Sequence, residues 1–78
     1  MYKYGAMYPN LEAEFARAGV KRVEIMRLLG INRTALYKKL IGVTNVTCSE
    51  MLSIQAYLEL KTGKKQNLDY LFANKDTI

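Results

Sequence analysis

Glycine placement is the feature of this sequence that most restricts its fold. Gly19, Gly30 and Gly42 divide the first half of the chain into segments of about ten residues. Glycine commonly ends helices because it adopts left-handed backbone angles without a steric penalty. Within the segments, apolar residues recur at three- and four-residue spacing and do not alternate as they do in strands. The pattern predicts an all-α chain of short helices.

Capping residues locate the first three helices, which we predict over residues 11–18, 21–29 and 33–41. An asparagine side chain suits the N-cap because its oxygen accepts a hydrogen bond from a free amide of the first turn. Asn10 and Asn32 are therefore expected to begin the first and the third helix.

The second half of the chain predicts two more helices, over residues 48–61 and 68–72. Thr47 and Glu50 have the spacing of a capping box, in which each side chain accepts from the backbone amide of the other residue. Cys48 is expected to be a small core residue. A second apolar stripe of the longer helix is expected to pack mainly against the last helix, with part left for a partner; it consists of Leu52, Ala56 and Leu60.

Length and composition place these helices in one domain. The 78 residues leave no room for two cores, and a composition that is 50% hydrophobic is that of a globular chain. We expect a flexible arm over 1–9 that includes Lys3, a domain over 10–73 and a tail over 74–78. No apolar run reaches the ~20 residues that a membrane span needs, and the start lacks a secretory signal, so we expect a cytoplasmic protein without membrane contact.

The sequence offers little for catalysis. It has no histidine and one cysteine, and its carboxylates are scattered. Such a set provides no metal-binding cluster, nucleophile–base pair or phosphate-binding loop. We therefore expect neither an enzyme nor a protein that carries a cofactor, a metal or a small-molecule ligand.

Positive charge is concentrated in the middle of the chain. Residues 21–40 hold six lysines and arginines against Glu24 alone, and this block supplies the whole net charge of +5. A compact basic block suits a polyanionic partner, and the phosphates of a nucleic acid are the obvious candidate.

The same block contains a helix, a glycine turn and another helix. Ile31 is expected to fill the gap between the two crossing helices, with Leu36 and Leu40 facing inward. The opposite side of the later helix carries hydroxyl, phenol, ammonium and guanidinium groups, which can bond base edges and phosphates. These outward residues are Arg33, Thr34, Tyr37 and Lys38, with the apolar Ile41 beside them.

The stretch VKRVEIMRLLGINRTALYKKLIG resembles the helix-turn-helix of phage Cro/repressor-type proteins, a xenobiotic-response-element-like family of small bacterial and prophage transcriptional regulators. The later TCSEMLSI and YLF resemble the fourth and fifth helices of small prophage members, so the resemblance spans roughly residues 9–73. It implies a compact five-helix lambda-repressor-like DNA-binding domain. It also implies a transcriptional regulator, a repressor, that binds double-stranded DNA sequence-specifically.

In that family the helix that here covers 33–41 is the recognition helix. The matched positions imply that Arg22 braces a phosphate or the first recognition residue, and that Asn45 lies near the DNA backbone. The family usually has a small residue where this chain has Met26, which we interpret as altered helix packing. With the capping asparagine included, the candidate DNA-binding set is Arg22, Asn32, Arg33, Thr34, Tyr37, Lys38 and Asn45.

A single domain of this kind contacts only a few base pairs, so we expect a homodimer on a palindromic site. Other interpretations stay open at this point. The helix pair could be an ordinary hairpin of a bundle, and Lys39 could be a solvated surface lysine. The helix-turn-helix could also serve as a protein-binding module, such as an inhibitor or an antirepressor, which an outward Ile41 and Tyr37 and the spare apolar stripe of the fourth helix would suit.

Overall fold

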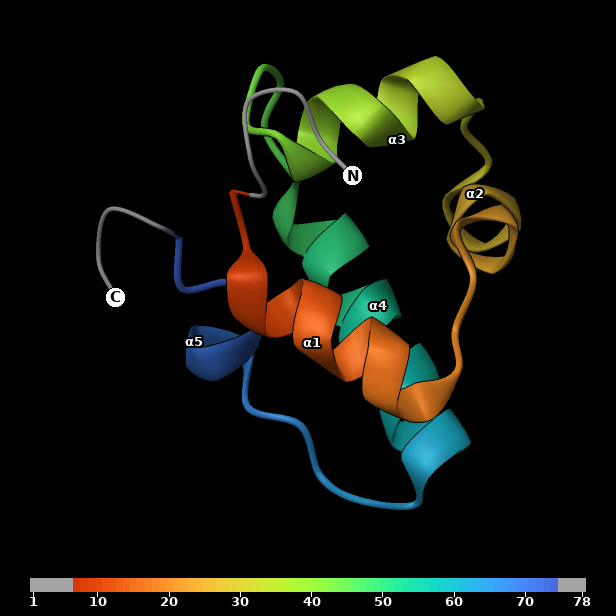
Figure 1. Cartoon of the computed structure of the whole chain (residues 1–78), viewed down its shortest axis with the longest axis vertical. Helices are drawn as coiled ribbons and strands as arrows, with labels where there is room; N and C mark the ends of the chain where they lie inside the picture. The colour runs from red at the N-terminus through yellow and green to blue at the C-terminus, as the bar shows by residue number, and fades with distance from the viewer. Residues whose placement is uncertain (1–6, 75–78) are drawn as a thin grey trace.

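A computed structural model describes residues 7–74, and within this range the chain forms helices and no strand. The all-helical prediction is confirmed, and Figure 1 shows α1 crossing α4, with α3 at one end of the molecule. Among the described residues, no helix combines the length and the apolar character that crossing a bilayer requires. The helices are α1 (Pro9–Ala18), α2 (Arg22–Leu29), α3 (Arg33–Leu40), α4 (Cys48–Thr62) and α5 (Leu68–Leu71).

A single core holds these helices together. Helix α1 contacts α4 and α5, and α2 contacts α3 and α4. Each helix contributes at least one buried side chain because its apolar residues fall on one side at helical spacing. The core cluster consists of Leu11, Phe15, Val20, Ile25, Leu36, Leu40, Ile54, Leu58 and Leu71.

The predicted end of α2 and the predicted starts of α3 and α4 are confirmed. Gly30 follows α2 with a φ of 66°, a left-handed conformation that a side chain would disfavour. Asn32 caps α3, since its Oδ1 accepts from the Ala35 amide at 2.8 Å. At the start of α4, Thr47 Oγ1 accepts from the Glu50 amide at 3.1 Å and Glu50 Oε1 accepts from the Thr47 amide at 2.9 Å, which is the expected capping box.

The predicted start of the first helix is wrong by two residues and in its cap. Helix α1 begins at Pro9, which suits the first helical position because its missing N–H needs no partner there. Tyr8 precedes it without a side-chain cap bond. Asn10 lies inside the helix, and its Nδ2 donates to the Tyr70 carbonyl at 2.9 Å, so it links α1 to α5 instead.

The described part of the predicted arm belongs to the fold. The Met7 amide donates to the Leu40 carbonyl at 2.9 Å, and the Met7 side chain packs against Gly42 so closely that an added Cβ there would lie 2.2 Å from Met7 Cε. Residues 7–9 are therefore not a free arm. Residues 1–6, including Lys3, and residues 75–78 of the predicted tail lie outside the described residues.

Two predictions of burial are wrong. Ile41, expected to face outward, is only 8% exposed; it follows Leu40, whose carbonyl accepts from the Met7 amide, so the segment before α1 lies against this end of α3. Cys48, expected in the core, is exposed. It lies roughly 100° around α4 from the side that carries Ile54 and Leu58, since each helical residue turns by about 100°.

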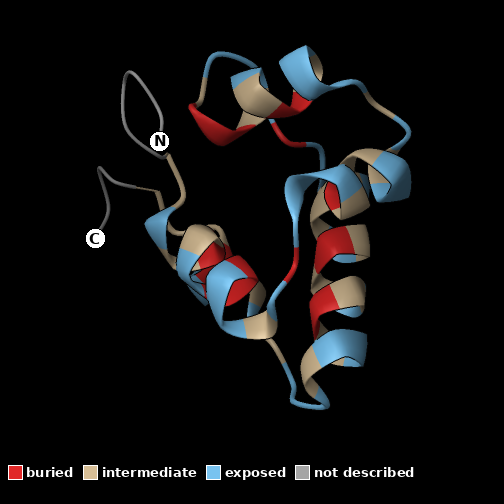
Figure 2. Cartoon of the chain, turned by 45° about the vertical axis from the view of Figure 1, so that its right-hand side comes forward, coloured by how far each residue is buried: buried red, intermediate tan, exposed pale blue. Residues whose placement is uncertain are grey.

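The apolar stripe of α4 is not covered by the last helix. Leu52 and Leu60 are 49% and 80% exposed, and Ala56 is exposed with them. Hydrogen bonds along another side of α4 direct the chain away from this stripe: Gln55 Nε2 donates to the Gln66 carbonyl at 2.8 Å, and the Gln66 amide donates to Glu59 Oε2 at 2.9 Å. Figure 2 shows the buried positions of α4 facing α1 and the exposed ones on the opposite side.

Candidate nucleic-acid interface

The turn between α2 and α3 sets the position of the candidate interface. The amide of Ile31 donates to the Met26 carbonyl at 3.0 Å, which closes the turn, and the half-buried Ile31 side chain packs against the core as predicted. Met26 also packs against the core as a half-buried residue, in agreement with its interpretation as a packing residue. Leu36 and Leu40 anchor α3 from its inner side, so its outer side is left facing solvent.

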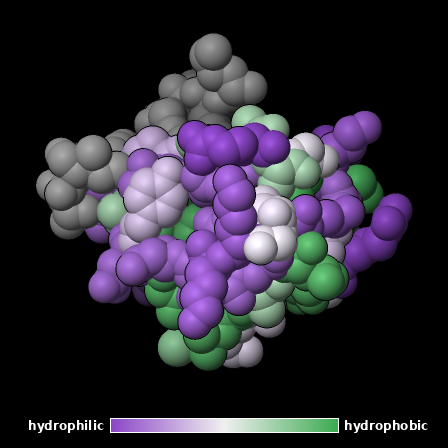
Figure 3. Space-filling model, turned by 90° about the horizontal axis from the view of Figure 1, so that it is seen from below, coloured by the Kyte–Doolittle hydropathy of each residue, from purple (hydrophilic) through white to green (hydrophobic). Residues whose placement is uncertain are grey.

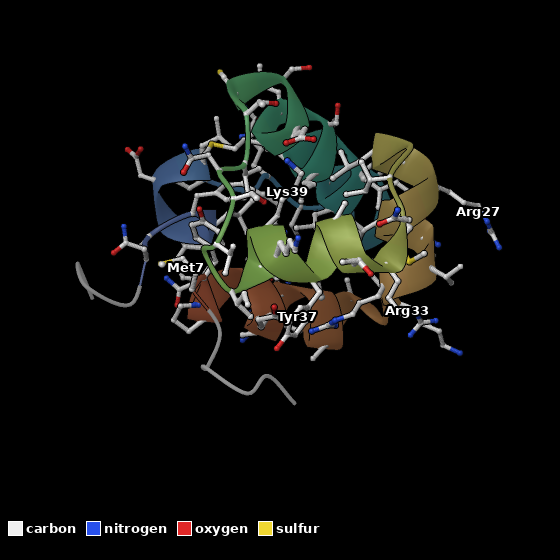
Figure 4. All side chains as sticks on the ribbon, turned by 90° about the horizontal axis from the view of Figure 1, so that it is seen from above. Met7, Arg27, Arg33, Tyr37 and Lys39 are labelled. Atoms are coloured by element: carbon white, nitrogen blue, oxygen red, sulfur yellow. The ribbon has the colours of Figure 1, made fainter. Side chains whose placement is uncertain are left out.

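The outer side of α3 carries most of the predicted recognition residues. Arg33, Thr34 and Lys38 are exposed, and Tyr37 is half-buried with contacts of its own. Viewed from the α3 end of the molecule, Arg33 and Tyr37 project to the α1 side of α3, whereas Lys39 lies on the α4 side (Figure 4). The structure therefore brings a hydroxyl and two cations to the solvent face of one short helix.

Four cations of the α2–α3 region are not neutralised by the protein. Within residues 7–74, they take part in no ion pair, although the other cations of this region do. Two come from the outer side of α3 and two from α2 or its N-cap, where Arg27 points away from the fold (Figure 4). These cations are Lys21, Arg27, Arg33 and Lys38.

Lys39 is not the solvated surface residue that the sequence suggested. Its side chain is only 15% exposed, and its Nζ lies 3.0 Å from Glu50 Oε1 and donates to the Asn45 carbonyl at 3.0 Å. Partial burial opposes the ionisation of Glu50, but the Thr47 amide and the Lys39 ammonium outweigh it and lower the pKa of Glu50. Lys39 therefore joins α3 to the following loop and to α4.

The loop after α3 lies beside the predicted recognition residues. The amides of Val43 and Thr44 donate to the Lys38 carbonyl at 2.9 and 3.2 Å, so the chain folds back along the end of α3. Asn45 is exposed in this loop, as its predicted place near a DNA backbone requires. A shallow depression of about 490 Å³ separates the loop from α3; its lining includes Asn32, Thr34, Lys38, Lys39, Thr44 and Glu50.

Arg22 differs from these four cations because it forms an ion pair with a carboxylate of the protein. Its Nη2 is 2.8 Å from Glu12 Oε1, so it ties the start of α2 to α1. Partial burial disfavours the charged form of both partners: it raises the pKa of Glu12 and lowers the pKa of Arg22. The guanidinium remains half-exposed, so a phosphate contact would have to share it with Glu12.

A polar cluster that the sequence analysis missed fixes α2 against α4. Tyr57 donates a hydrogen bond to Glu24, the Lys21 amide donates to Glu24 Oε2 at 2.8 Å, and Lys61 Nζ lies 3.4 Å from Glu24 Oε1. These partners stabilise the carboxylate and lower the pKa of Glu24 to about 2. The spacing of Lys21 and Glu24 hinted at a helix start, but no local pattern points to the partners on α4.

The exposed polar groups at this surface are hydrogen-bond donors. In the part of the chain that the structure describes, no three metal-ligating side chains come together. Exposed ammonium, guanidinium and hydroxyl groups at α3 can donate hydrogen bonds to phosphate oxygens and to acceptors on base edges. Comparison with models of protein families, with curated proteins and with solved structures finds no match to this chain.

Proposed function

We propose that this chain is a sequence-specific double-stranded DNA-binding protein, and that it acts as a phage- or prophage-type transcriptional repressor by binding rather than by catalysis. In this proposal the fold is a lambda-repressor-like domain, α2 and α3 are its helix-turn-helix, and α3 is the recognition helix. The observation that carries the proposal is the set of four cations around a solvent-facing α3 that form no ion pair within residues 7–74.

The surface of α3 suits a DNA groove. The major groove of B-DNA admits an α-helix, and its base edges present acceptors and methyl groups to side chains. Arg33 stands at the first position of α3, where a guanidinium can bond guanine O6 and N7 together, and Thr34 follows it with a hydroxyl and a methyl group. Lys38 lies one turn further along the same outer side. These three residues are the proposed base-reading set.

Four other residues near α3 have supporting roles in the proposal. Lys21 and Arg27 contribute phosphate contacts that carry affinity but no sequence information. Asn32 uses its Oδ1 as the cap of α3, which leaves its Nδ2 for a phosphate oxygen. Asn45 approaches the backbone from the loop.

The alternative function, a protein-binding module, loses one of its two supports. It relied on an outward Ile41 and Tyr37 and on the spare apolar stripe of α4. Ile41 is buried, whereas Leu52 and Leu60 of the stripe are exposed, so the stripe remains as a support for this alternative. A surface that exposes cations and a hydroxyl, with its apolar residue turned inward, favours a nucleic acid over an apolar protein partner.

Titration with DNA duplexes tests the proposal. A duplex enriched from a random pool would be titrated at two salt concentrations, and several phosphate contacts predict a steep loss of affinity with salt. Arg33→Ala should cost ~1–3 kcal/mol and relax specificity at one base position, whereas Lys21→Ala should weaken all sequences alike. Lys65→Ala is the matched control, because it removes the same charge from the loop at the end of the molecule away from α3 (Figure 1).

The outcomes separate a recognition surface from general attraction by charge. Equal losses for Lys65→Ala and Lys21→Ala would show that only net charge matters. An Arg33→Ala variant that loses the same affinity for selected and for random duplex would reject the base-reading role of Arg33.

A further inference from the structure

Of the three cations in the candidate DNA-binding set, Arg22 is the one whose charge the protein already balances. Within residues 7–74, its Nη2 lies 2.8 Å from Glu12 Oε1, whereas Arg33 and Lys38 form no ion pair. The carboxylate of Glu12 offers the guanidinium the same kind of charged oxygen acceptor as a DNA phosphate does. A phosphate that binds Arg22 must therefore replace Glu12 or share the guanidinium with it.

We propose that Glu12 is an internal competitor of DNA: in the free chain it holds Arg22 in the place of a phosphate, and a bound duplex displaces it. This inference rests on the proposed function, because it concerns how strongly the same surface binds DNA. Glu12 then limits the affinity of the chain for DNA and positions Arg22 beside the binding surface.

The core places both members of the pair. Glu12 lies on α1 between Leu11 and Phe15, which are 0% and 3% exposed and anchor this helix. Arg22 is the first residue of α2, three positions before the buried Ile25. Because buried side chains fix both helices, the carboxylate and the guanidinium meet without any cost in ordering the backbone. The pair is therefore already formed when a duplex arrives.

The pair lies beside the proposed recognition surface. Arg22 directly follows Lys21, which we propose as a phosphate contact. Glu12 belongs to α1, and Arg33 and Tyr37 project to the α1 side of α3 (Figure 4). A duplex that receives α3 in its major groove brings the phosphates beside that groove to the helices next to α3. The guanidinium of Arg22 is 44% exposed, so a phosphate can reach it from solvent.

Other charged groups of the protein are paired away from the candidate residues. Hydrophilic side chains also gather across the centre of the end of the molecule away from α3 (Figure 3), so polarity alone does not mark a DNA-binding surface. Arg17 pairs with Glu14 within α1, and Lys61 pairs with Glu24 and joins α4 to α2. Among the ion pairs of residues 7–74, only that of Arg22 occupies a candidate DNA-binding residue.

Exposure makes the pair weak enough to be displaced. The side chains of Arg22 and Glu12 are 44% and 20% exposed, and ion pairs that are open to solvent contribute little to stability. A DNA duplex carries one negative charge per about 1.7 Å of its axis, so its phosphates attract a cation more strongly than one carboxylate does. The competition should therefore weaken DNA binding about two- to fivefold without preventing it.

Neutralising Glu12 tests the competition. Affinity for the selected duplex would be measured at pH 8, where Glu12 is ionised, since burial raises its pKa to about 7. We expect Glu12→Gln to bind about two- to fivefold more tightly than the unchanged chain, with a logarithmic salt slope steeper by up to ~0.9, the value for one added phosphate contact. Asp69→Asn is the matched control, because it also neutralises one carboxylate, on a helix that does not contact α3. Its affinity should change much less.

A double-mutant cycle separates competition for Arg22 from simple repulsion between Glu12 and DNA. In an Arg22→Ala background, Glu12 has no guanidinium to hold at this position, so the gain from Glu12→Gln should largely disappear. Repulsion alone predicts the same gain in both backgrounds. Circular dichroism and urea unfolding would establish that each variant is folded at the temperature of the titration.

The results distinguish this inference from the proposed function. Specific binding in which Glu12→Gln gains no more than Asp69→Asn would overturn the competition and leave the DNA-binding function intact. A gain from Glu12→Gln that persists undiminished in the Arg22→Ala background would do the same. Absence of specific binding to any duplex, by the unchanged chain and by Glu12→Gln, would overturn both.

Discussion

Two leucines on the same helix provide a direct test of the packing of α4. Leu58 is 0% exposed and Leu60 is 80% exposed, although they are two residues apart. Replacing a buried leucine by alanine costs ~2–5 kcal/mol, because apolar contacts are lost and a cavity remains. Leu60→Ala removes side-chain atoms that already face water, so its cost should stay within about 0.5 kcal/mol. Both substitutions change helix propensity equally, so their difference isolates burial.

The expected difference is large compared with the stability of the whole domain. At ~0.05–0.15 kcal/mol per residue, a chain of this length has a free energy of unfolding of roughly 4–12 kcal/mol. A loss of about 3 kcal/mol would lower Tm by ~12–24 °C, at ~4–8 °C per kcal/mol for a domain of this size.

Urea and thermal unfolding, followed by circular dichroism at several protein concentrations, would measure both variants. Similar losses for Leu58→Ala and Leu60→Ala would refute the orientation of α4 around its axis. A Leu60→Ala loss that grows with protein concentration would refute the view that Leu60 is uncovered in the free chain.

Two further predictions concern the α2–α3 unit. Gly30→Ala should lower the free energy of unfolding in urea by ~1–2 kcal/mol, because φ at this position is 66°. The space around an added Cβ is open, so the whole cost comes from the backbone conformation. An unchanged urea midpoint would show that the turn is misplaced. The pKa of Glu24 is lowered from 4.5 to about 2, so its contribution to stability is complete above pH 4.5 and is lost as the pH falls toward 2. Glu24→Gln should therefore be less stable than the unchanged chain near neutral pH and should lose less stability between pH 4.5 and 2. Urea unfolding of both proteins across this pH range would measure the loss, and an equal loss in the two proteins would contradict the prediction.

The features that could be predicted from the sequence are those that depend on neighbouring residues. The cap of α3 at Asn32 and the capping box of Thr47 and Glu50 join residues three positions apart, so their spacing alone indicates them. The bond from Asn10 to Tyr70 joins α1 to α5 and replaces the expected cap. No local pattern encodes such a contact, because it exists only once the helices have packed.

The same distinction holds for the candidate interface. The exposure of Thr34 and Lys38 was predicted correctly, because Leu36 and Leu40 define the inner side of α3 by helical spacing. Lys39 was misjudged because its partners lie in the next loop and in α4. Nothing in the residues around Lys39 in the sequence indicates that its side chain is paired. The path of the chain after α4 was misjudged for a similar reason: the hydrogen bonds of Gln66 decide it.

The bond between Met7 and the last carbonyl of α3 has a practical consequence for measurements on this protein. It fixes the point where the preceding chain enters the fold at the α3 end of the molecule. A purification tag or fluorescent label fused ahead of Met7 would start from the carboxyl end of α3, the helix proposed to contact DNA, and its own charges would alter the measured affinity. Attachment after Asn74 starts from the side of α1 and α5, so binding experiments are better designed with fusions at the carboxyl end.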